Sequence, residues 1–78
     1  MDIHPLITTT ESLTQFCALI ADADFIAVDT EFMRENTFWP ELCLIQVASS
    51  DHAAAIDPLA AEIDLAPLMD LIVDNQDM

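Results

Sequence analysis

Glycine and tyrosine are absent from this 78-residue chain, and Arg34 is its only lysine or arginine. Without glycine, the chain cannot build the phosphate-binding loops of the Walker and Rossmann types, whose tight turns depend on that residue. With 15 acidic residues and a formal net charge of −14, its surface should repel nucleic acid, because phosphates are bound through Lys and Arg. The charge indicates either an ordinary acidic surface or a protein whose basic part lies elsewhere.

Long apolar runs are also missing, although 54% of the residues are hydrophobic. No run approaches the ~20 residues of a membrane span, and Met1-Asp2-Ile3-His4-Pro5 lacks the features of a signal peptide. We therefore expect a cytoplasmic protein without a membrane partner. Cys17 and Cys43 fall in apolar segments, which predicts reduced, buried thiols and no disulfide or metal site.

The N-terminal third predicts a short edge strand at Leu6-Ile7 followed by a helix. Thr8-Thr9-Thr10-Glu11 fits a capping box with Thr8 as N-cap. One apolar stripe at helical spacing follows, formed by Leu13, Phe16, Cys17 and Ile20. A second helix is predicted after an N-cap at Asp64, with Pro67 tolerated in its first turn. Its stripe consists of Leu65, Leu68, Met69 and Ile72.

Between the helices the sequence predicts three strands, over Phe25–Phe32, Glu41–Ala48 and Ala53–Ile56. Phe25 to Val28 has the pattern of a buried strand, and Ser49-Ser50-Asp51-His52 predicts a tight turn that makes an antiparallel hairpin of the last two strands. Strands that are apolar on both sides predict layers on both faces of an α/β sheet. Two helices cannot supply both layers, so more of the same chain or another copy should complete the sheet.

Asp29 and Glu31 close the first of these strands with Thr30 between them. Side chains alternate along a strand, so the two carboxylates should share a face, with their Cα atoms roughly 6.5–7 Å apart. Such a pair can hold one hard divalent cation or bridge two. The alternative is a strand end that simply meets solvent.

The segment "FIAVDTEFMRENTFWPELCLIQVA", residues 25–48, resembles the first exonuclease motif and the following hairpin of the ribonuclease D family of DEDD 3′–5′ exonucleases. "LITTTESL", "AAAIDPLA" and "DLAPLMDLI" are similar to the neighbouring family segments, so the resemblance covers nearly the whole chain. It implies part of a ribonuclease H-like fold, with a mixed sheet and an antiparallel hairpin flanked by helices.

In that family four acidic residues from three motifs hold two divalent metals, Mg²⁺ or Mn²⁺, and a tyrosine positions the attacking water. The resemblance implies that Asp29 and Glu31 are first-motif catalytic metal ligands, and that Thr30 and Phe32 contact the terminal nucleotide of the substrate. The substrate it implies is an RNA 3′ end, typically in transfer RNA maturation.

The chain departs from the family pattern after Asp74, where the second acidic motif would be expected, and it has no tyrosine for the third. Residues 1–78 therefore resemble the N-terminal part of an exonuclease domain, which we predict to be inactive alone. One alternative is a non-enzymatic module that self-associates to cover its unfinished sheet. Another is an acidic protein that binds Ca²⁺ or mimics nucleic acid, although it shows no EF-hand spacing.

The remaining candidate residues have ordinary structural explanations. His4 and His52 are predicted to be surface histidines, and Asp57 before Pro58 is predicted to cap a turn. Phe38-Trp39 could stack on a base, but packing under the hairpin is the commoner fate. Arg34 could reach a phosphate or offset neighbouring acids.

Overall fold

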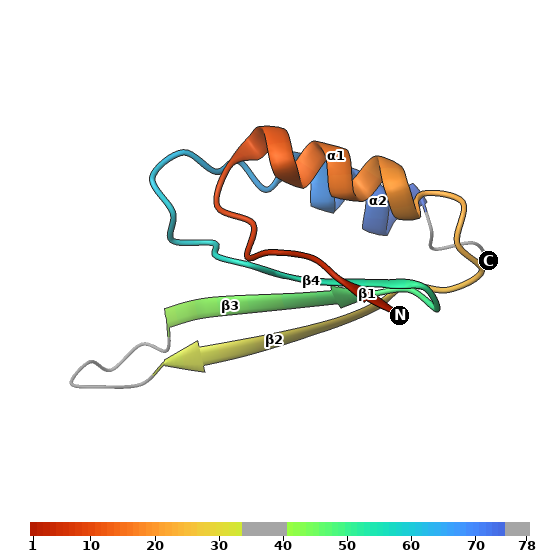
Figure 1. Ribbon diagram of the computed structural model, residues 1–78. Coiled ribbons are helices and arrows are strands. Elements are labelled where there is room, and N and C mark those ends of the chain that lie inside the picture. The colour runs from red at the N-terminus through yellow and green to blue at the C-terminus, as the bar shows by residue number, and fades with distance from the viewer. Residues whose placement is uncertain (34–40, 75–78) are drawn as a thin grey trace.

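The chain folds into one four-stranded sheet with two helices on one side of it, as the computed structural model shows for residues 1–33 and 41–74 (Figure 1). The elements in chain order are β1 (Asp2–Ile3), α1 (Thr10–Ile20), β2 (Ala27–Met33), β3 (Glu41–Ala48), β4 (His52–Ile56) and α2 (Ala66–Asp74). None of the helices in this part of the chain has the length and apolar character needed to cross a membrane.

The strands lie in the order β1-β4-β3-β2, so β1 and β2 form the two edges. β3 is antiparallel to both β2 and β4, whereas β1 pairs with β4 in parallel. This arrangement confirms the predicted α/β class and the β3–β4 hairpin. The expected edge strand at Leu6-Ile7 is wrong, because only Ile7 forms an isolated bridge there, to Ile56. Pro5, which has no N–H to donate, separates this bridge from β1.

Helix α1 starts one residue later than the sequence predicted. Its N-cap is Thr9, in an extended conformation, and the Thr9 side chain accepts a hydrogen bond from the Ser12 N–H over 3.2 Å. Thr8 is therefore not the cap, because a run of three threonines offers several equivalent oxygens and only one can meet the first turn. The predicted stripe is confirmed, since its four members are all buried.

The core fills the space between the helices and the inner face of β3 and β4. Its buried members are Ile7, Leu13, Phe16, Cys17, Ile20, Ile45, Val47, Ala54, Ile56, Leu68 and Leu71. Because alternate residues of β3 and β4 enter this core, their other residues point to the opposite face. The sheet thus has a covered face and an open face.

Helix α2 begins at Ala66, one residue later than an N-cap at Asp64 predicts, and it is rotated relative to the predicted stripe. The Asp64 carboxylate accepts a hydrogen bond from the Ala66 N–H over 2.9 Å, and the helix buries Leu68 and Leu71. Met69 is 48% exposed, so its predicted place in the core is wrong. The buried pair, Leu68 and Leu71, is spaced i, i+3. The sequence offers Leu71 as readily as Met69 for the apolar stripe, so spacing alone could not decide between them.

The N-terminal half of the first predicted strand is neither buried nor fully a strand. β2 begins at Ala27, Phe25 lies outside it with 54% of its surface exposed, and Val28 is also exposed. These residues are exposed because β2 lies at one edge of the sheet, whereas α1 packs on β4, which is separated from β2 by β3. The two described helices lie on one face only, so they do not supply the expected second layer, which stays a prediction (Figure 1).

The β3–β4 turn closes without a left-handed residue. Ser49 is buried, its N–H donates to the His52 carbonyl oxygen over 2.7 Å, and its hydroxyl oxygen accepts from the N–H groups of Asp51 and His52. Positive φ angles are absent from all of the described residues. The side chain of Ser49 thus provides the turn geometry for which many hairpins use glycine.

Candidate functional site

The cross-strand register of β2 decides where the two carboxylates point. Asp29 pairs with Gln46 and Glu31 with Leu44, whereas the intervening Thr30 pairs with the buried Ile45. Partners in an antiparallel pair share a face. Asp29 and Glu31 therefore project together from the open face of the sheet, as their spacing predicted.

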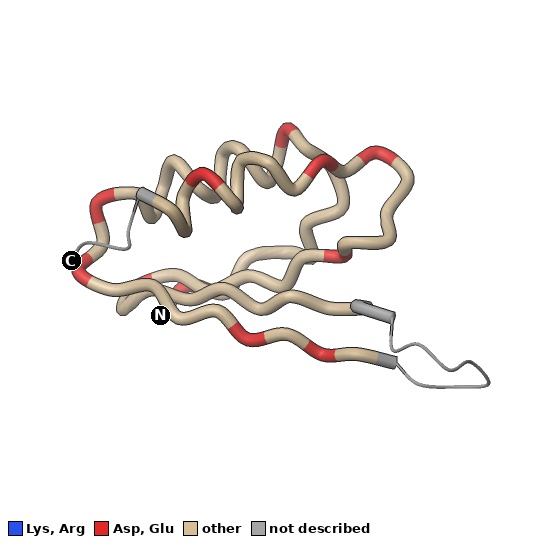
Figure 2. Tube along the Cα trace, turned by 180° about the vertical axis from the view of Figure 1, so that it is seen from behind, with Lys and Arg blue, Asp and Glu red and all other residues tan. Residues whose placement is uncertain are grey.

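Both carboxylates are exposed to solvent, because β2 has β3 as its single neighbour. The acidic positions of β2 follow one another along the outer strand in Figure 2, and no basic residue occurs in the part of the chain that the structure describes. Its one ion pair joins His52 to Asp2 and lies elsewhere. Arg34 and Phe38-Trp39 fall outside the described residues. The pair therefore has no described counter-charge.

A β-bulge follows the carboxylate pair, and no sequence pattern indicated it. The register shifts between Glu31 and Phe32, so that Cys43 is the extra residue on β3. The Cys43 thiol donates a hydrogen bond to the Glu31 carbonyl oxygen over 3.4 Å. Bulges are common beside active sites because they redirect side chains. Here the regular alternation ends immediately after Glu31, and the exposed Phe32 ring follows it.

Beside Asp29 the open face is hollowed to a volume of about 440 Å³. Small side chains form much of its lining, which includes Ala27, Ala48, Ala53 and Ala55, together with Ile3 at the β1 side. Asp29 and Gln46 are the polar side chains that belong to the open face there. The hollow is thus a shallow, mostly apolar floor with one carboxylate at its rim.

Two carboxylates supply hard oxygen ligands of the kind that Mg²⁺ and Mn²⁺ prefer. Residues 1–33 and 41–74 contain no group of three or more His, Cys, Asp or Glu side chains placed to hold a metal ion. Asp29 and Glu31 thus fit a divalent cation as part of a ligand set. Further ligands would have to come from outside these residues.

The other candidate residues lie away from this pair. Asp57 accepts a hydrogen bond from the Leu59 N–H over 2.9 Å, which confirms its turn-capping role. His4 and His52, predicted to be surface histidines, are half-buried and contact each other. They are 48 positions apart in the sequence, so no local pattern could indicate this contact.

Comparison with known proteins places this geometry in a family. Residues 5–77 match the family model described as 3′-5′ exonuclease. The chain belongs to the 3′-5′ exonuclease family. The match contains β2 with its carboxylate pair, both helices and the β3–β4 hairpin.

Ribonuclease D proteins are among the members of the exonuclease family most similar to the chain. It is 64% identical over all 78 residues to ribonuclease D of Sphingobium indicum and 59% identical to that of Zymomonas mobilis. The solved structure of Escherichia coli RNase D, described as an exoribonuclease involved in structured RNA processing, matches 91% of the chain with a TM-score of 0.78 and 39% identity. The expected ribonuclease H-like fold is thereby confirmed. The chain spans about a fifth of the length of these relatives.

Proposed function

We propose that residues 1–78 are the N-terminal part of the exonuclease domain of a ribonuclease D-like 3′–5′ exoribonuclease. The observation that carries this proposal is the placement of Asp29 and Glu31 on one face of β2, inside the segment matched to the exonuclease family. Ribonuclease D relatives at 64% and 59% identity support the specific activity. The proposed substrate is an RNA 3′ end, with transfer RNA maturation as the process.

Within that activity, Asp29 and Glu31 would serve as catalytic ligands of Mg²⁺ or Mn²⁺. A bound divalent metal supplies an activated water and stabilises the leaving oxygen in phosphodiester hydrolysis. The strand holds the two carboxylates in fixed relation, and their exposure leaves both free to coordinate. Thr30 and Phe32 would contact the terminal nucleotide, and the ring of Phe32, 58% exposed, is available for stacking on a base.

The chain by itself should not hydrolyse RNA. Two carboxylates leave most of a Mg²⁺ ion's waters in place, and the ion binds tightly only when more carboxylates and substrate phosphates surround it. No tyrosine is present to position water, and a net charge of −14 opposes the approach of RNA. The catalytic role of this segment is therefore to present one half of a ligand set.

A chimaera tests the proposal directly. Residues 1–78 replace the corresponding first fifth of Sphingobium indicum ribonuclease D, and release of nucleoside monophosphates from a 3′-labelled RNA is measured with Mn²⁺. We expect an active chimaera, and Asp29→Asn should lower its rate about a thousandfold, because a metal ligand contributes several kcal/mol to the transition state.

Asp24→Asn is the matched control, because Asp24 is an exposed aspartate just before β2. It removes the same charge and should leave the rate unchanged. Equal rates for Asp29→Asn and the unsubstituted chimaera would contradict the proposal. So would RNA hydrolysis by the isolated 78-residue chain that Asp29→Asn abolishes, since the chain would then be a complete enzyme.

A second candidate function, self-association, is favoured by the unpaired edge of β2 and by the open face beside it. A seven-residue edge strand, paired on one side only among the described residues, is a template for pairing with another copy. Because each copy carries a charge of −14, association should strengthen as salt screens the repulsion. Sedimentation velocity at low and high NaCl measures this, with Ala55→Glu on the open face as the disrupting variant. A monomer at every salt concentration would rule out this function.

A further inference from the structure

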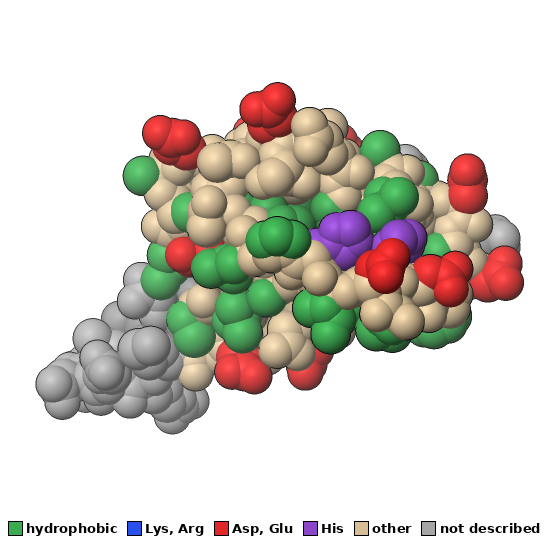
Figure 3. Space-filling model, viewed as in Figure 1, with side chains coloured by type: hydrophobic (Ala, Val, Ile, Leu, Met, Phe, Trp, Pro, Cys, Tyr) green, Lys and Arg blue, Asp and Glu red, His purple; other side chains and the backbone are tan. Residues whose placement is uncertain are grey.

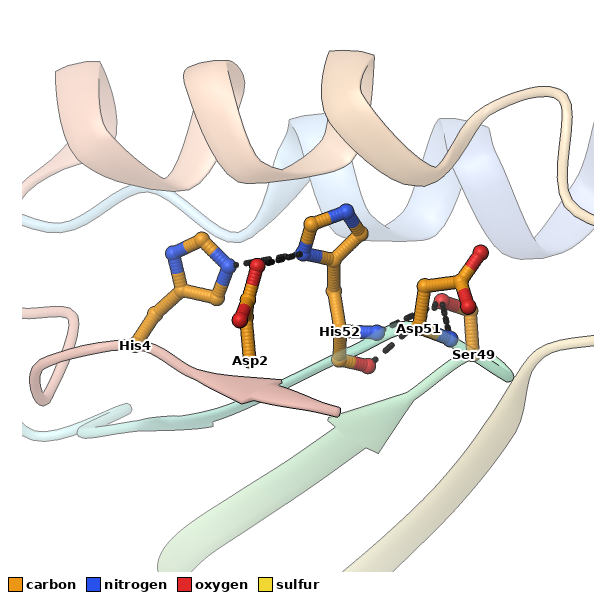
Figure 4. A network of polar contacts seen from close by, with 5 residues as sticks. All are labelled: Asp2, His4, Ser49, Asp51 and His52. Carbon is orange, nitrogen blue, oxygen red and sulfur yellow. Dashed lines mark hydrogen bonds and ion pairs between the residues drawn. The ribbon is translucent and has the colours of Figure 1, made fainter.

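Two histidines from distant parts of the chain meet at the edge of the sheet. His4 follows β1 and His52 begins β4, and His4 Nε2 lies 3.1 Å from His52 Nδ1 (Figure 4). The Asp2 carboxylate, which belongs to β1, lies 3.9 Å from the same nitrogen of His52. Both rings reach the surface beneath the helices, where they appear side by side in Figure 3.

The backbone fixes this arrangement on both sides. Asp2 is the register partner of His52 in the parallel β1–β4 pair, so their side chains share a face. The Asp2 N–H donates to the Asp51 carbonyl oxygen and the His4 N–H to the Ala53 carbonyl oxygen, over 2.8 and 2.9 Å. β1 contains only two residues. These backbone hydrogen bonds and the His4–His52 contact together hold β1 on β4.

The charges around the pair are all negative among the described residues. Asp2 approaches from β1, and a hollow of about 310 Å³ beside His52 is lined by Asp22, Asp24 and Asp51. Helix α1 contributes no charge to the contact, only the ring of Phe16, which meets His4 edge-on at a centroid distance of 5.2 Å. If the pair takes up a proton, the added charge faces the Asp2 carboxylate and this acidic hollow.

The chemistry of two facing imidazoles limits the pair to that one proton. In the contact one ring nitrogen must donate a hydrogen and the other must accept it with a lone pair. If both rings are protonated, both facing nitrogens carry hydrogen, the hydrogen bond is lost, and two cations stand with ring centroids 5.1 Å apart. When the two rings are apart, both can carry a proton without facing each other. The separated arrangement therefore binds more protons than the contact does, and it gains stability relative to the contact as pH falls.

We propose that His4 and His52 form a proton-sensitive histidine clasp that holds β1 on β4 and releases it when both rings are protonated. Release should occur within the range of about pH 8 to 5 in which imidazoles change charge. Ile3 and His4 also line the hollow that Asp29 borders. Opening the clasp would therefore uncover one side of that hollow. The inference stands apart from the exonuclease function, because it concerns the N-terminal segment itself.

Amide hydrogen exchange followed by NMR tests the histidine clasp in the 78-residue chain. The His4 N–H reports on the clasp, and the Ile7 N–H, which donates to Ala55 on the same strand over 2.9 Å, is the internal control. Relative to Ile7, the protection of His4 should fall about tenfold between pH 7 and pH 5, because its docking bond opens.

The variant His4→Gln separates proton sensitivity from a merely structural contact. Glutamine keeps a hydrogen-bond partner for His52 but takes no proton in this range, so β1 should stay docked at pH 5. His52→Gln gives the same test from the other side. The proposal is overturned if His4 and Ile7 lose protection together, or if His4→Gln shows the same pH-dependent loss.

Discussion

At the scale of single residues, burial separates the two cysteines. Cys17 lies in the core on α1, and this burial raises the pKa of its thiol above the ordinary 9.0, since charge is disfavoured there. Cys43 is half-exposed on β3 and donates its S–H to the backbone of Glu31. The prediction of two buried thiols is therefore right for Cys17 and wrong for Cys43, since Cys43 is the extra residue of the bulge on β3 and lies outside the stretch that pairs with β4.

A thiol-modification experiment follows from this difference. At pH 8 a disulfide reagent should label Cys43 quickly and Cys17 only as the chain unfolds, because the thiolate is the reactive form and Cys17 is both buried and protonated. Cys43→Ser and Cys17→Ala identify the two rates. Since the unfolded chain loses the Cys17 proton first, stability should also decline as pH rises through about 9 and beyond. Equal labelling rates in the folded chain would contradict this assignment.

At the scale of elements, the cap of α1 offers a pair of neighbouring threonines with different roles. Thr9→Ala removes the oxygen that accepts from the Ser12 N–H and should lower the free energy of unfolding by about 1 kcal/mol. Thr8→Ala makes the same chemical change at an exposed residue outside the cap and should change it much less. Urea unfolding followed by circular dichroism compares the two. If Thr8→Ala lowers the free energy of unfolding more than Thr9→Ala does, Thr8 is the N-cap, as the sequence predicted.

Sequence patterns predicted those elements whose neighbours lie close along the chain. The stripe of α1, the bounds of β3 and the hairpin it makes with β4 were all predicted, because each depends on spacing within a few residues. The carboxylate pair belongs to this group, since alternation alone puts Asp29 and Glu31 on one face. β1, the bulge at Glu31 and the rotation of α2 depend on distant partners. No local pattern encodes those partners, so they required the structure.

At the scale of the whole molecule, charge dominates behaviour toward RNA. With one basic residue against 15 acidic ones, the 78-residue chain can release few counterions from RNA. We expect no binding of a fluorescent single-stranded oligoribonucleotide by anisotropy, even at low salt, where such contacts are strongest. The chimaera with the remainder of Sphingobium indicum ribonuclease D should bind, and its affinity should fall with salt. Tight binding by the short chain alone would show that contacts other than phosphate pairing dominate.

The backbone of the described residues carries one further consequence, for mutational tolerance. Since none of them has a positive φ, no position there requires glycine, and the backbone conformation alone excludes few residue types. Substitutions in the β3–β4 turn should be limited by the loss of the Ser49 hydroxyl contacts rather than by steric strain. A saturation library of this chain should therefore show its sharpest intolerance at Ser49 within the turn, with Ser50 and Asp51 accepting most side chains.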